Sequence, residues 1–139
     1  MDWTWVDVLW HVLAYPIYQI LGTIRHEGCH AIVAKHYGAT IEEFRFLPCR
    51  RDGVWYWGYV RWSGALTEGQ ARAVRRAPYP VDVLLVAAWA YLYACQMALF
   101  GGSFHPFAIV TILLLVSPVI DIVYNTLKAA VWGRGDLVG

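Results

Sequence analysis

The stretch YPIYQILGTIRHEGCHAIVA, residues 15–34, decides the fold, because it places ionisable side chains inside a long apolar segment. Its charged and histidine side chains are Arg25, His26, Glu27 and His30. Two histidines four residues apart lie one turn apart on the same helical face, so both imidazoles can reach one metal ion. Ionisable groups at membrane depth are costly and indicate a functional site. The stretch therefore predicts a metal-binding helix within a membrane.

The composition is that of an integral membrane protein. Of the 139 residues, 59% are hydrophobic and 15% are charged, and the mean hydropathy is +0.44. Soluble domains carry roughly 25% charged residues, so we expect a single membrane domain over residues 1–139, embedded in the lipid bilayer. A net charge of +1 argues against a nucleic acid partner. The acidic start of the chain lacks the basic segment of a cleavable signal peptide.

Three segments are long and apolar enough to be predicted as membrane spans, since a spanning helix needs about 20 mostly apolar residues. They are residues 5–36, 81–100 and 106–132. Between the first two, residues 39–78 predict a β-hairpin with its turn at 48–53, and then a short helix opened by a capping box at Thr67 and Gln70. The expected fold class is an all-α membrane protein with a small β element. It has three transmembrane helices, with the hairpin and a short interfacial helix between helices 1 and 2.

The distribution of basic residues predicts the orientation in the membrane. Seven arginines fall in the hairpin region, and Lys128 and Arg134 follow the last span, whereas the N-terminus and the loop at Gly101 carry no Lys or Arg. Basic residues are enriched in cytoplasmic segments. The N-terminus is therefore predicted outside, with the hairpin and the C-terminus cytoplasmic.

A third metal ligand is expected from the last span, because catalytic zinc usually takes three protein ligands and a water. At ~1.5 Å per residue, His30 and Asp121 lie roughly 13 and 10 Å from the same ends of their helices. Asp121 is also the only carboxylate deep within the second and third spans. The alternative for Asp121 is an ion pair with Arg25. Ser117 and Asn125, one turn to either side on the same face, are candidates for substrate binding.

These residues resemble the site-2 protease group of intramembrane zinc metalloproteases. The similar strings are His26-Glu27-Gly28-Cys29-His30, continued to Gly38, and Ser117-Pro118-Val119-Ile120-Asp121. The resemblance covers residues 17–128 and corresponds to the three-helix core of that family. Two positions depart from the family pattern: Leu115 stands where the family has asparagine, and Ile122 where it often has glycine.

The resemblance implies a zinc metalloendopeptidase that hydrolyses peptide bonds of membrane-embedded substrates. His26, His30 and Asp121 would bind Zn²⁺, and Glu27 would be the general base for a zinc-activated water. A substrate must unwind before cleavage, and the hairpin around Tyr56 and Gly58 could hold it by strand addition.

Other interpretations stay open on the sequence alone. The hairpin tryptophans also suit an interfacial anchor. A catalytically silent zinc-binding scaffold that binds partner helices is the main competing function, although metal retention alone does not need Glu27. Bis-histidine haem ligation is a third interpretation. It would favour one histidine on each of two helices, whereas His26 and His30 lie in one predicted helix. Three helices are also compatible with a homo-oligomer or a regulatory partner.

Overall fold

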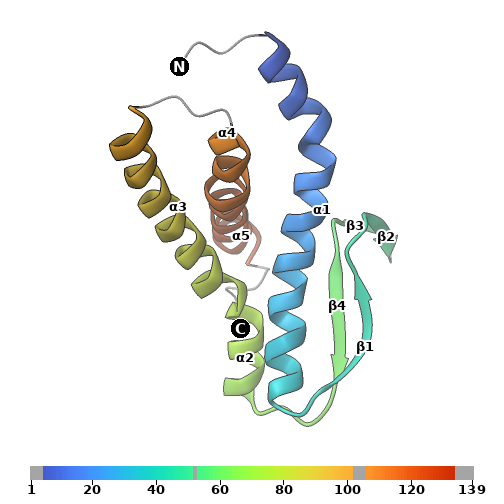
Figure 1. Ribbon diagram of the computed structural model, residues 1–139. Coiled ribbons are helices and arrows are strands. Elements are labelled where there is room, and N and C mark those ends of the chain that lie inside the picture. Colours follow the sequence, from blue (N-terminus) through green and yellow to red (C-terminus); the bar gives the residue numbers. More distant parts are fainter. Residues whose placement is uncertain (1–4, 52, 102–105, 134–139) are drawn as a thin grey trace.

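The first element is one long helix, as predicted. The computed structural model describes residues 5–51, 53–101 and 106–133 (Figure 1). Helix α1, Trp5–His36, continues through Pro16 and ends at Gly38, which has a φ of 85°. Such a conformation suits glycine, which has no Cβ to clash. The chain leaves α1 there and enters the strands.

The predicted β-hairpin is confirmed, with a shorter turn than expected. Strand β1, Thr40–Arg45, pairs antiparallel with β4, Tyr59–Ser63, and β2, Cys49–Arg51, pairs with β3, Val54–Tyr56. The turn predicted at 48–53 therefore includes a strand, because Cys49–Arg51 finds backbone partners in β3. Gly53, with a φ of 81°, precedes the returning strand.

The capping box at Thr67 is also confirmed. Gln70 N–H donates to Thr67 Oγ1, and Thr67 N–H donates to Gln70 Oε1, at the start of α2, Glu68–Arg76. Helix α3, Pro78–Phe100, begins three residues before the predicted position 81. Its prolines lie in the first turn, where a missing N–H removes no helical hydrogen bond.

The last helical stretch is not uniform, contrary to the prediction of one helix over 106–132. It consists of α4, Pro106–Thr111, a π-helical turn η1, Ile112–Val116, and α5, Ser117–Trp132. Within η1, the Ser117 N–H donates to the carbonyl of Ile112. Pro118 has no N–H, and its ring would clash with the carbonyl four residues earlier in a regular helix. The wider turn relieves that conflict, and such turns recur at functional sites. The predicted connection at 101–103 lies outside the described residues apart from Gly101.

Helix α1 is the centre of the arrangement. It contacts α2, α3 and α5 as well as strands β1 and β4. In Figure 1 the strands run along the C-terminal half of α1, on the side away from α3. The hairpin and α5 therefore both adjoin the part of α1 that carries the histidines.

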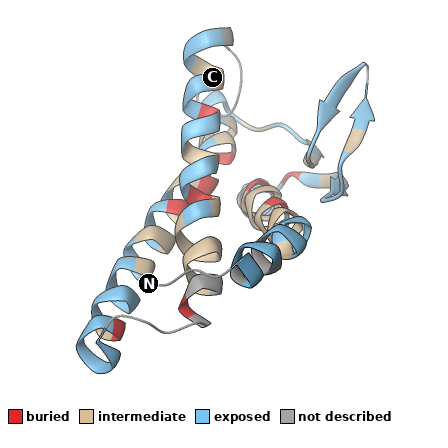
Figure 2. Ribbon diagram, turned by 90° about the horizontal axis from the view of Figure 1, so that it is seen from above, coloured by how far each residue is buried: buried red, intermediate tan, exposed pale blue. Residues whose placement is uncertain are grey.

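Polar side chains lie inside the protein and large apolar side chains lie outside. The buried polar residues are Thr23, His30, Asp82, Gln96 and Asn125, whereas the outer faces of α1, α3 and α5 expose many aliphatic and aromatic side chains (Figure 2). Water-soluble proteins bury most large apolar groups. In the described residues, the outer faces of the helices are thus largely apolar, whereas several polar side chains lie inside.

Two helical stretches in the described chain are long and apolar enough to cross a membrane. They are Glu68–Phe100, which joins α2 and α3, and Ile112–Val131. Helix α1, predicted as the first of three spans, is not one of them. Its tyrosines, Gln19, Thr23 and the charged group at 25–27 lower its hydropathy. The fold is thus mostly helical with a small β element, and two rather than three helices meet this criterion.

Candidate metal centre

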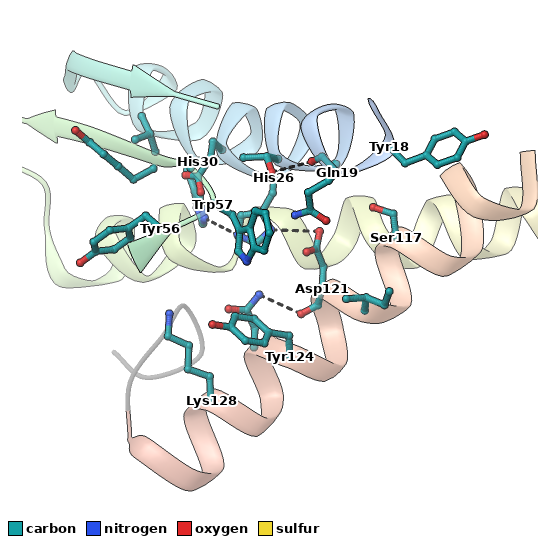
Figure 3. Close-up of a pocket in the computed structure, with 18 of the residues that line it drawn as sticks. Tyr18, Gln19, His26, His30, Tyr56, Trp57, Ser117, Asp121, Tyr124 and Lys128 are labelled. Carbon is teal, nitrogen blue, oxygen red and sulfur yellow. Dashed lines mark hydrogen bonds and ion pairs between the residues drawn. The ribbon is translucent and has the colours of Figure 1, made fainter. Parts of the chain in front are cut away.

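A pocket of about 490 Å³ lies between α1, the returning half of the hairpin and α5. All eight residues that the sequence predicts for the site line this pocket. They are His26, Glu27 and His30 from α1, Tyr56 and Gly58 from the hairpin, and Ser117, Asp121 and Asn125 from α5. In Figure 3, Trp57 lies across the histidines from the hairpin side, and Tyr124 and Lys128 continue the α5 wall. The fold brings together residues that lie up to 99 positions apart.

The two histidines are spaced as ligands of one zinc ion. Their Nε2 atoms lie 3.3 Å apart, and the ring planes are inclined by 80°. Two nitrogens that each lie ~2.0–2.1 Å from a tetrahedral zinc are separated by roughly 3.3–3.4 Å. The observed spacing therefore fits a shared tetrahedral metal.

A backbone carbonyl fixes the orientation of the second imidazole. His30 Nδ1 lies 2.7 Å from the carbonyl oxygen of Val74, in α2. Because a carbonyl can only accept, Nδ1 carries the proton and Nε2 presents its lone pair to the pocket. Histidine ligands of metals commonly donate their other N–H in this way. The sequence predicted α2 but gave no signal that its backbone would support the site.

Glu27 lines the same pocket, beside the point where Gly58 of the hairpin packs against α1. A Cβ atom at Gly58 would lie 3.4 Å from Glu27 Cγ. The hairpin backbone therefore passes directly beside the predicted base. Tyr56, two residues earlier, also lines the pocket and is 37% exposed.

Asp121 lies beside the first histidine and is bound to Arg25. Its Oδ2 lies 3.6 Å from His26 Nδ1 (Figure 3). The same oxygen forms an ion pair with the Arg25 guanidinium. The pairing that the sequence left open as an alternative is thus present. It does not exclude metal ligation, because a carboxylate has two oxygens and about four lone-pair positions.

The other two α5 residues support the wall of the pocket in different ways. Asn125 is buried, and its Nδ2 donates to the backbone carbonyl of Asp121 at 3.0 Å. Ser117 faces Gly22, where a Cβ atom would lie 2.7 Å from Ser117 Oγ. The close approach of Ser117 to Gly22 joins α5 to α1 one turn from Asp121, whereas the Asn125 bond lies within α5.

Asp82 joins the site, and sequence reasoning gave it no role. Its side chain is 1% exposed, and its Oδ1 lies 3.0 Å from the guanidinium of Arg25. Ligand atoms of His26, Asp82 and Asp121 all lie within 4.8 Å of one another. The one signal in the sequence was that Asp82 is the only charged residue of α3. Because Asp82 lies at the start of the predicted span, the sequence was equally consistent with a side chain in water.

No protein-family model, curated protein or solved structure matches this chain.

Proposed function

We propose that this protein is an integral membrane zinc metalloprotease of the site-2 protease type. The observation that carries the proposal is the 3.3 Å spacing of the His26 and His30 Nε2 atoms in a pocket that also holds Glu27 and Asp121. Metal retention explains the histidines but does not itself require a glutamate at position 27. The resemblance of the two sequence strings to that protease group points the same way.

The donor set suits zinc. Imidazole nitrogen and carboxylate oxygen are the ligands of catalytic zinc sites, which keep one position open for water. His26 and His30 would hold the ion through Nε2. Asp121 lies beside Nδ1 of His26, so its side chain would turn toward the ion to become the third protein ligand. When bound, zinc makes its water acidic at neutral pH and polarises a substrate carbonyl.

Glu27 is the proton carrier of the proposed reaction. It follows His26 directly in α1 and lines the same pocket. Its carboxylate accepts the proton of the attacking water and later returns it to the leaving amine nitrogen. Glutamine at this position has nearly the same shape but cannot accept that proton, which makes it the decisive variant.

The hairpin is the proposed binding surface for the unwound substrate. Within the described chain, β4 pairs only with β1, so its other edge has backbone groups that an extended peptide can meet. Tyr59, Val60 and Trp62 of β4 line the pocket together with Tyr56 and Gly58. Strand addition recognises any sequence through its backbone, while neighbouring side chains select among substrates.

The outer surface supports insertion of the whole helical unit into the bilayer. Val12, Leu13 and Ile17 of α1 are each about 60% exposed, although α1 is less apolar than the other two long stretches. Such side chains are unfavourable in water and favourable in lipid. We place the N-terminus outside and the hairpin and C-terminus in the cytoplasm. The substrate class is then a membrane helix that unwinds near the cytoplasmic face.

The test compares the wild type with Glu27→Gln, both purified as the full chain in lipid nanodiscs with a panel of membrane-helix substrates. Wild-type cleavage that is lost in Glu27→Gln, at unchanged zinc content, is the expected result. Zinc binding without cleavage in either protein would favour the silent scaffold. Cleavage at the wild-type rate by Glu27→Gln would contradict the assigned base.

A further inference from the structure

Arg25 connects three helices through two carboxylates. Its guanidinium forms ion pairs with Asp82 of α3 and Asp121 of α5, and Arg25 immediately precedes His26 in α1. Asp82 is almost fully buried, and Asp121 is 28% exposed toward the pocket. The two carboxylates therefore differ: one faces the protein interior and the other faces the candidate metal centre.

This arrangement provides Arg25 with a second carboxylate besides Asp121. A guanidinium that had Asp121 as its sole partner would compete with a divalent cation for the same carboxylate. Arginine presents five N–H donors in a fixed fork, so it can bond to two carboxylates at once. Asp82 gives Arg25 a full counter-charge of its own, which leaves the charge of Asp121 to the metal while Arg25 still holds its position.

Stability alone does not account for the cluster. Replacing a buried ion pair with apolar groups is often neutral or stabilising, and charges within membrane segments are costly. An apolar residue at position 82 would match the rest of α3, which carries no other charge. A role in the site explains why the charge is there.

We propose that Asp82 is the counter-charge of Arg25 and that this pair positions Asp121 for metal binding. The inference rests on the proposed zinc site and adds two positioning residues to it. Neither residue would contact the substrate. Their effect would reach the metal through the Asp121 carboxylate.

The experiment measures the zinc dissociation constant of the full chain in nanodiscs by competition with a chromophoric chelator. The variants are Asp82→Asn, Asp82→Glu and the double variant Arg25→Gln/Asp82→Asn. We expect Asp82→Asn to weaken zinc binding by about 10- to 100-fold, the usual effect of losing a group that supports a ligand. Asp82→Glu keeps the charge and should retain most of the affinity. The double variant removes the competing guanidinium but also the support that Arg25 gives Asp121, so it should bind zinc more tightly than Asp82→Asn and less tightly than the wild type.

A matched control comes from an exposed ion pair away from the pocket. Glu68 and Arg72 in α2 are paired at 2.9 Å, and Glu68→Gln/Arg72→Gln should leave zinc affinity unchanged. If Asp82→Asn does not fold, the charge-neutral double variant and Asp82→Glu carry the test.

Two results would overturn the inference while the proposed function stands. One is wild-type zinc affinity in Asp82→Asn. The other is a double variant that binds zinc as weakly as Asp82→Asn, because neutralising Arg25 cannot replace a missing ligand and Asp82 would then be a ligand itself. A wild-type chain that binds no zinc would overturn the proposed function as well.

Discussion

The backbone of Gly58 lies so close to Thr23 of α1 that a Cβ atom at position 58 would come within 2.3 Å of Thr23 Cγ2 and 2.7 Å of the Arg45 carbonyl oxygen. Gly58→Ala must therefore push the hairpin away from α1. We expect a loss of about 1–3 kcal/mol in stability, typical of overpacking, and a larger proportional loss of cleavage because the pocket wall moves. Thermal unfolding and cleavage rates in nanodiscs measure both.

Two variants separate this clash from a general effect of replacing glycine. Gly69→Ala lies in α2 with no atom within 4 Å of the added Cβ, and it should not reduce cleavage. Thr23→Ser removes Cγ2 but keeps the hydroxyl that donates to the Gln19 carbonyl at 2.8 Å, so Gly58→Ala/Thr23→Ser should recover part of the stability. Full activity of Gly58→Ala alone would show that the hairpin does not shape the pocket.

Asp121 can act on zinc as a ligand or by orienting His26. The carboxylate lies 3.6 Å from His26 Nδ1, on the edge of the ring away from Nε2, so both roles need testing. If Asp121 is a ligand, Asp121→Ala and Asp121→Asn should lose zinc to the same extent, because a neutral amide is a poor replacement for a charged carboxylate oxygen. Zinc content after dialysis against a weak chelator is the measurement. Near-normal zinc in Asp121→Asn, with loss only in Asp121→Ala, would instead assign Asp121 as the acceptor of the His26 N–H.

Local patterns in the sequence predicted most of the fold, because each depends on residues near one another in the chain. The α1 boundaries, the hairpin and the Thr67 capping box follow from such patterns. The π-helical turn before Pro118 did not, because the steric conflict of a proline can be relieved by a kink, a break or a wider turn. The expectation that α1 is a third span was not confirmed by the hydropathy criterion, because its polar and charged residues make it less apolar than the other two stretches.

The residues that line the candidate site were predicted from the sequence, but the contacts that support them were not. The spacing of His26 and His30 allows both imidazoles to reach one metal ion in any helix. In contrast, the bond from His30 to the Val74 carbonyl depends on how α2 packs. Every residue has a backbone carbonyl, so the sequence does not indicate which one will accept this bond. Asp82 was missed for the same reason, since only the packing of α3 against α1 turns a charge at a helix start into a buried partner of Arg25.

The orientation in the membrane is a separate prediction that does not depend on catalysis. The seven arginines of residues 38–80 predict that the hairpin lies in the cytoplasm. A variant with the three native cysteines replaced and Arg50→Cys introduced should react with a membrane-impermeant maleimide only in inverted vesicles. An epitope tag before residue 1 should be removed by protease only from the outside. Labelling of position 50 in intact cells would reverse the proposed topology and put the hairpin outside.

A final prediction concerns the pH response of the hairpin, where Glu43 of β1 meets Tyr59 of β4. A hydrogen bond from Tyr59, and then Arg45, lowers the pKa of Glu43, and the same bond to Glu43 raises the pKa of Tyr59. The ionised Glu43 therefore stabilises the folded hairpin above the ordinary glutamate pKa, and this contribution is lost as the pH falls through the lowered value. The protonated Tyr59 stabilises it below the ordinary tyrosine pKa, and that contribution is lost as the pH rises through the raised value.

Glu43→Gln should move the pKa of Tyr59 back toward the ordinary value of about 10. The measurement is an NMR titration with ring-labelled tyrosine, in which Tyr59→Phe assigns the signal. Glu42→Gln is the matched control, because Glu42 pairs with Arg61 at 3.1 Å and does not contribute to the Tyr59 shift. An ordinary Tyr59 titration in the wild type would mean that the Glu43–Tyr59 bond does not form in solution, and the register of β1 against β4 would then lack this support.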